Sequence, residues 1–183
     1  VASATRCAAT PTAPSCGRAN PMRLASRVVI VGVYVVVFWL VLPAALWALA
    51  RRVDHAFGWA LSPSWVGTLP AAVGAWFLFG GIAVLWTRGR GLPVSALPPP
   101  KLTVTGPYRV VRHPIYFGFN LVVLGLGLML GSRGLWAVVA PGFFPVWVVY
   151  ALVEERGLAR RFGDDWSRYK REVGLLPRWP SRA

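Results

Sequence analysis

The sequence predicts an all-α integral membrane protein, in which four transmembrane helices form a bundle and a C-terminal amphipathic helix lies at the membrane interface. The first observation is the composition: 56% of the 183 residues are apolar and 14% are charged. In a soluble domain, roughly 45–50% of the residues are apolar and about 25% are charged. The second observation is that apolar residues gather into four runs without a charged side chain, residues 28–50, 65–86, 115–131 and 134–153.

The lengths of these runs decide how many can cross a membrane. A helix needs roughly 20 residues to cross a hydrocarbon core of about 30 Å. Three of the runs meet this length, and the run 115–131 can also span if it is helical from its first residue. Pro141 and Pro145 could divide the last run into two shorter helices, which would give five transmembrane helices instead of four.

The basic residues predict the orientation of the bundle. The chain has 20 Lys and Arg against six Asp and Glu, a formal net charge of +14. With both termini on one side of the membrane, 17 of the basic residues lie on that side and three on the other. The positive-inside rule then predicts that both termini and the connection 87–113 are cytoplasmic, where they also attract anionic membrane lipids. Because no basic stripe lies on a water-soluble fold, we expect no nucleic-acid binding.

The first 27 residues differ from the rest of the chain. They are rich in Ala, Ser, Thr and Pro, contain no acid, and lack the apolar core of a secretory signal. We expect residues 1–27 to form a disordered cytoplasmic tail, with an organelle transit peptide as the alternative. Cys7 and Cys16 have no metal-ligating neighbours, so we expect free thiols and no metal site. Residues 28–183 then form a single membrane-embedded domain.

The connection 87–113 ends in the densest chemical motif of the chain. Its prolines rule out a continuous helix, and a long loop inside a compact protein is usually functional or disordered. Pro114 suits the first position of a helix, which makes His113 the expected N-cap, and Tyr116 follows on the same helical face. Such a helix start attracts a carboxylate or phosphate of a ligand. The alternative, which explains these residues equally well, is a basic segment that flanks the membrane at the level of the lipid headgroups and binds no ligand.

Two adjacent acids form the second chemical signal. Glu154 and Glu155 directly follow the last apolar run, where an unpaired carboxylate is costly. A short turn around Ser132 would make the runs 115–131 and 134–153 antiparallel neighbours and bring Glu154 beside His113. The alternative is that one of the two acids forms a structural salt bridge with Arg109 or Arg112.

The segment after these acids has a helical apolar period. Leu158, Phe162, Trp166, Tyr169 and Val173 recur every three or four residues, with basic residues between them. This pattern predicts an interfacial helix, bent at Gly163, over the cytoplasmic mouth of the bundle. The alternative is a membrane anchor without a part in chemistry.

These motifs, in this order, resemble one family of membrane enzymes. The pattern G-P-Y-x₃-R-H-P-x-Y, an apolar span, a second span ending in E-E, and then F-G-x₂-W-x₂-Y is similar to the isoprenylcysteine carboxyl methyltransferase and phospholipid methyltransferase family. The resemblance covers residues 101–177. It implies an integral membrane methyltransferase that binds S-adenosylmethionine at the cytoplasmic side, between the last spans, and releases S-adenosylhomocysteine.

The resemblance also assigns residues to roles. The implied cofactor-binding residues are Leu102, Thr103, Tyr108, His113, Pro114, Ile115, Tyr116 and Glu154, of which Glu154 would hold the amino group of the cofactor. From the residues themselves, Arg109, Arg112 and Glu155 are the candidate catalytic residues: the two arginines could steer an anionic headgroup or carboxylate of the acceptor, and a lipid-facing role at the membrane surface explains them equally well. The family's eukaryotic members carry a substrate-contacting Arg shortly before the Glu, and this chain has Tyr150 at the matching position. That departure argues against a prenylcysteine carboxylate as the substrate.

Methyl transfer from a sulfonium is an in-line displacement, which alignment and desolvation can accelerate. We therefore expect a membrane methyltransferase whose acceptor is isoprenylcysteine-like, a lipid or a small hydrophobic molecule, and enters from the bilayer. One alternative is an NADPH-dependent enzyme like the membrane sterol reductases, which have a similar closing pattern. The other is a non-enzymatic membrane scaffold.

Overall fold

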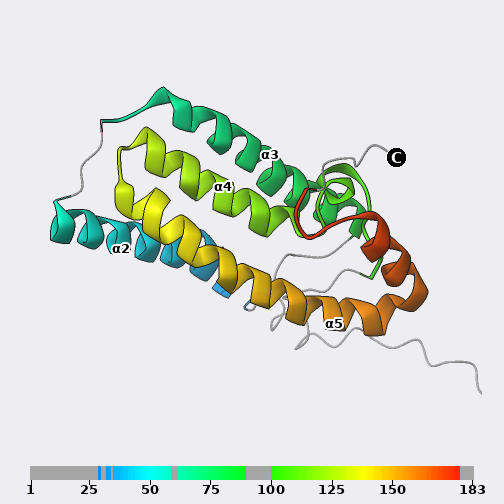
Figure 1. Cartoon of the computed structure of the whole chain (residues 1–183). Helices are drawn as coiled ribbons and strands as arrows, with labels where there is room; N and C mark the ends of the chain where they lie inside the picture. Colours follow the sequence, from blue (N-terminus) through cyan, green and yellow to red (C-terminus); the bar gives the residue numbers. More distant parts are fainter. Residues whose placement is uncertain (1–28, 30–31, 34, 59–61, 90–99, 178–183) are drawn as a thin grey trace, which may run out of the picture.

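The computed structural model describes residues 29, 32–33, 35–58, 62–89 and 100–177, and in these residues the chain is all-helical. Four α-helices dominate it (Figure 1): α2 (Leu42–Phe57), α3 (Thr68–Val84), α4 (Pro114–Met129) and α5 (Ala140–Glu172). Short 3₁₀ and π turns adjoin them: η1 (Val37–Val41), η2 (Trp65–Gly67), η3 (Leu85–Gly89), η4 (Gly106–Arg109) and η5 (Gly134–Val139). The predicted all-α class is confirmed for the described part of the chain.

Two of the described helices are long and apolar enough to cross a membrane, Trp65–Gly89 and Gly134–Glu172, and Pro114–Met129 is a shorter apolar helix. The tail 1–27 with its two cysteines, the start of the first apolar run and residues 90–99 of the long connection lie outside the described residues. The full number of transmembrane helices therefore stays a prediction.

The last apolar run forms one continuous helix. The π turn η5 leads directly into α5, which has a proline in its first turn and continues through Pro145. The predicted alternative, a break at Pro141 or Pro145 into two helices, is therefore not seen. The helix bends further on, at Gly163, whose φ of 49° and ψ of −119° are not helical.

Helices α3 and α4 lie side by side along most of their length (Figure 1), and glycines allow their close approach. Gly74 lies opposite Gly118, and Gly67 lies opposite Gly125. A Cβ added to Gly74 would lie 2.7 Å from the carbonyl oxygen of Gly118, and one added to Gly118 would lie 2.6 Å from that of Gly74. Small residues at such positions are typical of helix pairs in membranes.

A carboxylate joins the end of α2 to the start of η5. Asp54 accepts hydrogen bonds from the hydroxyl of Ser132, at 2.5 Å, and from the backbone N–H of Gly134, at 2.7 Å. It thus satisfies a backbone donor at a helix start that has no partner within the helix. The Ser132 hydroxyl in turn accepts from the N–H of Leu135. This contact fixes the turn between α4 and η5, and therefore the antiparallel course of α4 and α5.

A substitution that adds one methyl group at the contact between α3 and α4 tests their close packing. We expect Gly74→Ala to lower the free energy of unfolding in detergent by about 1–3 kcal/mol, because the added Cβ overpacks the helix contact. The matched control is Gly157→Ala in α5, where a Cβ would meet nothing within 4 Å and where the higher helix propensity of Ala should stabilise by up to about 1 kcal/mol. Equal effects of the two substitutions would contradict the packing assignment.

Candidate functional site

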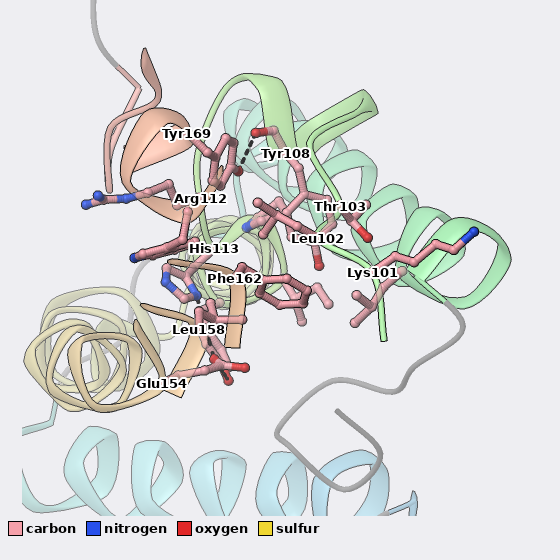
Figure 2. Close-up of a pocket in the computed structure, with 15 residues that line it drawn as sticks. Lys101, Leu102, Thr103, Tyr108, Arg112, His113, Glu154, Leu158, Phe162 and Tyr169 are labelled. Atoms are coloured by element: carbon pink, nitrogen blue, oxygen red, sulfur yellow. Dashed lines mark hydrogen bonds and ion pairs between the residues drawn. The ribbon is translucent and has the colours of Figure 1, made fainter. Parts of the chain in front are cut away.

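A pocket lined by charged, polar and apolar side chains, called the polar pocket below because His113 and Glu154 face it, lies at the N-terminal end of α4, where the segment 101–113, the middle of α5 and the bent end of α5 meet. Figure 2 shows the side chains that converge there. All the predicted cofactor-binding residues line the pocket, and so does one of the predicted catalytic residues: Leu102, Thr103, Tyr108, Arg112, His113, Pro114, Ile115, Tyr116 and Glu154. The structure therefore brings together residues that are up to 52 positions apart in the sequence.

His113 is the N-cap of α4, as the sequence predicts, because Pro114 occupies the first helical position. Its side chain is 6% exposed and lies between two carboxylates. The Nδ1 atom is 3.7 Å from Oε2 of Glu154, and the Nε2 atom is 3.6 Å from Oε1 of Glu155. The prediction that antiparallel packing brings Glu154 beside His113 is confirmed.

Glu154 forms the acidic wall of the pocket. Its Oε2 atom accepts a hydrogen bond of 3.1 Å from the hydroxyl of Tyr116, and its side chain is 24% exposed. The Tyr116 ring also stacks on the His113 ring, with 5.7 Å between the ring centroids. One carboxylate, one helix start and several aromatic rings thus surround the same space. Such a pocket suits a ligand that carries both a positive and a negative group.

Glu155 has a different environment from Glu154. It is 4% exposed, and it pairs with Arg112 Nε at 3.2 Å and Lys170 Nζ at 2.8 Å. Neither Glu155 nor the exposed Arg109 is among the described residues that line the pocket. The alternative of a structural salt bridge is therefore confirmed for Glu155 and Arg112, while Arg112 also reaches the pocket wall.

The bent end of α5 closes the pocket. Beyond Gly163 the chain turns back toward the segment 101–113 (Figures 1 and 2), and the Tyr169 hydroxyl donates a 2.6 Å hydrogen bond to the carbonyl oxygen of Tyr108. The backbone N–H of Arg112 donates to the carbonyl oxygen of Gly174 at 3.0 Å. Burial, with the nearby Glu154, raises the pKa of the Tyr108 phenol, so Tyr108 is a neutral hydroxyl at physiological pH.

The sequence predicted a helix over this end of the bundle, but the resemblance assigned none of that helix's residues to the cofactor pocket. The described lining also contains Leu158, Phe162, Trp166 and Tyr169 of α5, four of the five residues whose helical period predicted an interfacial helix. Their spacing predicted an apolar face correctly. It could not show that the face turns inward onto the pocket, because that direction depends on the positive φ of Gly163.

A second cavity, of about 690 Å³, adjoins the polar pocket. Side chains of η1, α2, α3, α4, η5 and α5 line it, and they are almost entirely apolar or aromatic. Ile115 and Tyr116 line both cavities. The start of α4 is thus a shared wall between a polar pocket and an apolar one.

The comparisons with known proteins assign the chain to a family. The family model described as Phospholipid methyltransferase matches residues 63–165, which include α3, α4 and most of α5. The chain therefore belongs to the phospholipid methyltransferase family, and the resemblance derived from its motifs is confirmed. It is a methyltransferase-family protein with at least two helices that are long and apolar enough to cross a membrane.

The chain is also similar to individual proteins of known name. The chain is 29% identical over 148 residues to the methanethiol S-methyltransferase of Mycobacterium tuberculosis, an alignment that covers 79% of this chain and 57% of the relative. It is 35% identical over 81 residues to methanethiol S-methyltransferase 1 of Bradyrhizobium diazoefficiens, covering 44% and 27%. It is also 30% identical over 148 residues to the cobalt-zinc-cadmium resistance protein CzcN of Cupriavidus metallidurans, covering 81% and 63%. The chain spans less than two thirds of the length of each of these relatives. No solved structure matches it significantly.

The ion cluster around Glu155 gives a test of stability. We expect Glu155→Gln to lower the free energy of unfolding by about 3–5 kcal/mol, because it leaves the buried Arg112 without its carboxylate. Denaturant titration of the purified protein in detergent measures this change. The matched control is Asp165→Asn, which removes an acid from an exposed pair with Arg168 and should change stability little. A Glu155→Gln effect as small as that of the control would contradict a structural role for the pair.

Proposed function

We propose that this protein is an integral membrane methyltransferase that takes a methyl group from S-adenosylmethionine and passes it to a lipophilic or amphiphilic acceptor. The observation that carries the proposal is the pocket in which Glu154, the helix start at His113 and several aromatic rings surround one space. The family membership and the relatives named as methyltransferases support the reaction class.

The chemistry of the pocket fits this cofactor. The carboxylate of Glu154 would hold the amino group, and the N-terminal end of α4 beyond His113 would attract the carboxylate. Tyr108, Tyr116 and Trp166 offer aromatic faces to the adenine and the sulfonium. The hydroxyl of Thr103 is buried without a hydrogen-bond partner in the described part of the chain, so a polar ligand would satisfy it. When bound, the cofactor supplies the electrophilic methyl group.

The size of the pocket requires one wall to move. The pocket encloses about 70 Å³, whereas sites for ligands of this size usually measure about 300–1,000 Å³. The wall that follows Gly163 is held by the hydrogen bond from Tyr169 to Tyr108 and by the ion pair of Lys170 with Glu155. We expect this segment to move outward when the cofactor binds.

The remaining residues would exclude water and position the acceptor. Leu158 and Phe162 cover the pocket with apolar groups, and desolvation strengthens the electrostatic contacts inside it. Arg112 is held in place by Glu155 and would direct a positive group toward the pocket. Because Arg109 is exposed and off the pocket wall, we propose for it only a role at the membrane surface.

The arrangement in the membrane is part of the same proposal. Residues 28–183 would form one domain of four spans, with both termini and the pocket on the cytoplasmic side. The bent end of α5 would lie at the interface, with its basic residues toward lipid headgroups. The soluble cofactor would then enter from the cytoplasm, while the acceptor would enter from the bilayer.

Calorimetric titration with S-adenosylhomocysteine tests the proposal. We expect binding by the purified protein in detergent, and at least about a tenfold loss of affinity in Glu154→Ala, which removes the partner of the amino group, and in His113→Ala, which removes the ring that positions Glu154 at the start of α4. The matched control is Glu172→Ala, an exposed acid at the end of α5, which should bind like the unchanged protein.

The same titration separates the alternatives. Binding of NADPH in place of S-adenosylhomocysteine would favour a reductase-like enzyme, and binding of neither would favour a scaffold. Unchanged affinity in both pocket variants would show that the ligand binds elsewhere. Circular dichroism of each variant establishes that it is folded before its affinity is compared.

A further inference from the structure

We infer that the apolar cavity of about 690 Å³ is a binding site for a methyl acceptor that is uncharged as well as lipophilic. This inference rests on the proposed function, because it treats the polar pocket on the other side of Tyr116 as the cofactor site. The inference restricts the proposed class of acceptor. The part of the acceptor that enters the cavity would contain neither a carboxylate nor an ammonium group.

The volume of the cavity indicates the size of its ligand. Sites for ligands with several tens of atoms measure about 300–1,000 Å³, and this cavity falls inside that range. An acceptor of one or two carbon atoms would leave most of it empty. Apolar walls from four α-helices, among them Leu46 of α2, Phe79 of α3 and Phe119 of α4, can bury a long hydrocarbon body.

The walls of the cavity exclude a charged group. No Asp, Glu, Lys, Arg or His is among the described residues that line it. A charge moved from water into such a space without a partner costs several kcal/mol. Tyr150, a neutral aromatic residue, lines the α5 side of this cavity. A carboxylate therefore has no described cationic partner here, and an ammonium group has no described acidic one.

The cavity does offer a neutral polar contact. Trp147 is 2% exposed and lines the cavity, and its indole nitrogen has no hydrogen-bond partner in the described part of the chain. A buried donor without a partner is costly, and an uncharged oxygen or sulfur of the acceptor would satisfy it. Trp147 stacks on Tyr116 with 6.4 Å between the ring centroids, so this donor lies near the shared wall.

The position of the cavity connects it to the chemistry. Ile115 and Tyr116 line both the cavity and the polar pocket. The hydroxyl of Tyr116 is engaged by Glu154 on the polar side, while its ring contacts Trp147 and Tyr150 on the apolar side. A ligand in the cavity would present its reacting atom at this wall, next to the place where the methyl donor would lie, and a thiol or hydroxyl would release its proton across the wall toward Glu154 and His113 of the polar pocket.

Four probes with the same ten-carbon chain and different head groups test the inference. They are 1-decanethiol, 1-decanol, decanoate and decyltrimethylammonium, added at pH 7 to the full chain in nanodiscs of uncharged lipid. A change in tryptophan fluorescence reports binding, because Trp39, Trp47 and Trp147 line the cavity and a ligand alters their surroundings, and loss of part of the change in Trp147→Phe identifies the site. We expect the two neutral probes to bind at least about tenfold more tightly than the two charged ones.

A positive charge introduced at Tyr150 should create an affinity for a charged probe that the unchanged cavity excludes. We expect Tyr150→Arg to raise the affinity for decanoate by about tenfold or more, because it places a cation on the cavity wall. The control is Val149→Arg, whose side chain is 62% exposed and is not among the described residues that line the cavity. That variant should leave the order of the four probes unchanged.

Two outcomes would overturn the inference. Equal affinity for all four probes would make the cavity a lipid-filled gap without selectivity, and tightest binding of decanoate or decyltrimethylammonium by the unchanged protein would reverse the charge preference. Titration of the same preparation with S-adenosylhomocysteine distinguishes this failure from that of the proposed function. If S-adenosylhomocysteine binds and the probes show no preference, only the acceptor inference fails. If neutral probes bind and S-adenosylhomocysteine does not, the cavity assignment stands and the cofactor assignment fails.

Discussion

The buried ion pair between Arg112 and Glu155 is the contact on which the rest of the site depends. It joins the residue before the N-cap of α4 to the middle of α5, and Lys170 adds the bent end of α5 to the same carboxylate. A charge buried to this degree must keep its partner, so the start of α4 and the middle of α5 are held in one arrangement, whereas the half-exposed Lys170 can release the bent end of α5 when the pocket opens. The neighbouring residues, His113 and Glu154, are thereby fixed on the pocket side. The two adjacent acids differ in role, because Glu155 joins the segments through ion pairs and Glu154 faces the polar pocket.

The approach of α3 to α4 is the second condition for this geometry. A Cβ at Gly81 would lie 3.0 Å from Cγ1 of Ile115 and 3.2 Å from Cγ of Pro114. A larger residue would therefore push α3 away from the first turn of α4, where the wall between the two cavities stands. At the other end, Asp54 fixes the turn between α4 and η5. The position of the site thus depends on packing along the whole length of α4 as well as on the motif itself.

The sequence predicted the parts of the site that depend on neighbours along the chain. Pro114 was enough to place His113 at a helix start, and the short turn near Ser132 was enough to bring Glu154 beside it. The contacts it could not predict join segments whose relative register no local pattern encodes. Asp54 has no motif around it, and its partners are 78 and 80 residues away. The inward turn of the α5 end depends on the positive φ of Gly163, at which the sequence predicted a bend, but the pairing of Tyr169 with Tyr108 and of Lys170 with Glu155 follows from no local pattern.

Under the proposed function, the two cavities account for the concentration of polar residues at one end of so apolar a chain. A charged cofactor and a lipophilic acceptor prefer different solvents, so an enzyme that joins them needs a polar and an apolar chamber with one thin wall between them. Tyr116 suits that wall because its hydroxyl is satisfied by Glu154 while its ring packs against Trp147. A purely aliphatic residue would leave Glu154 without this donor, and a charged residue would bring an unpaired charge to the apolar side. Tyrosine meets both requirements, because it has an aromatic ring with one polar hydroxyl group. The shared wall at Tyr116 is therefore the element that would bring the methyl donor in the polar pocket next to the acceptor in the apolar cavity.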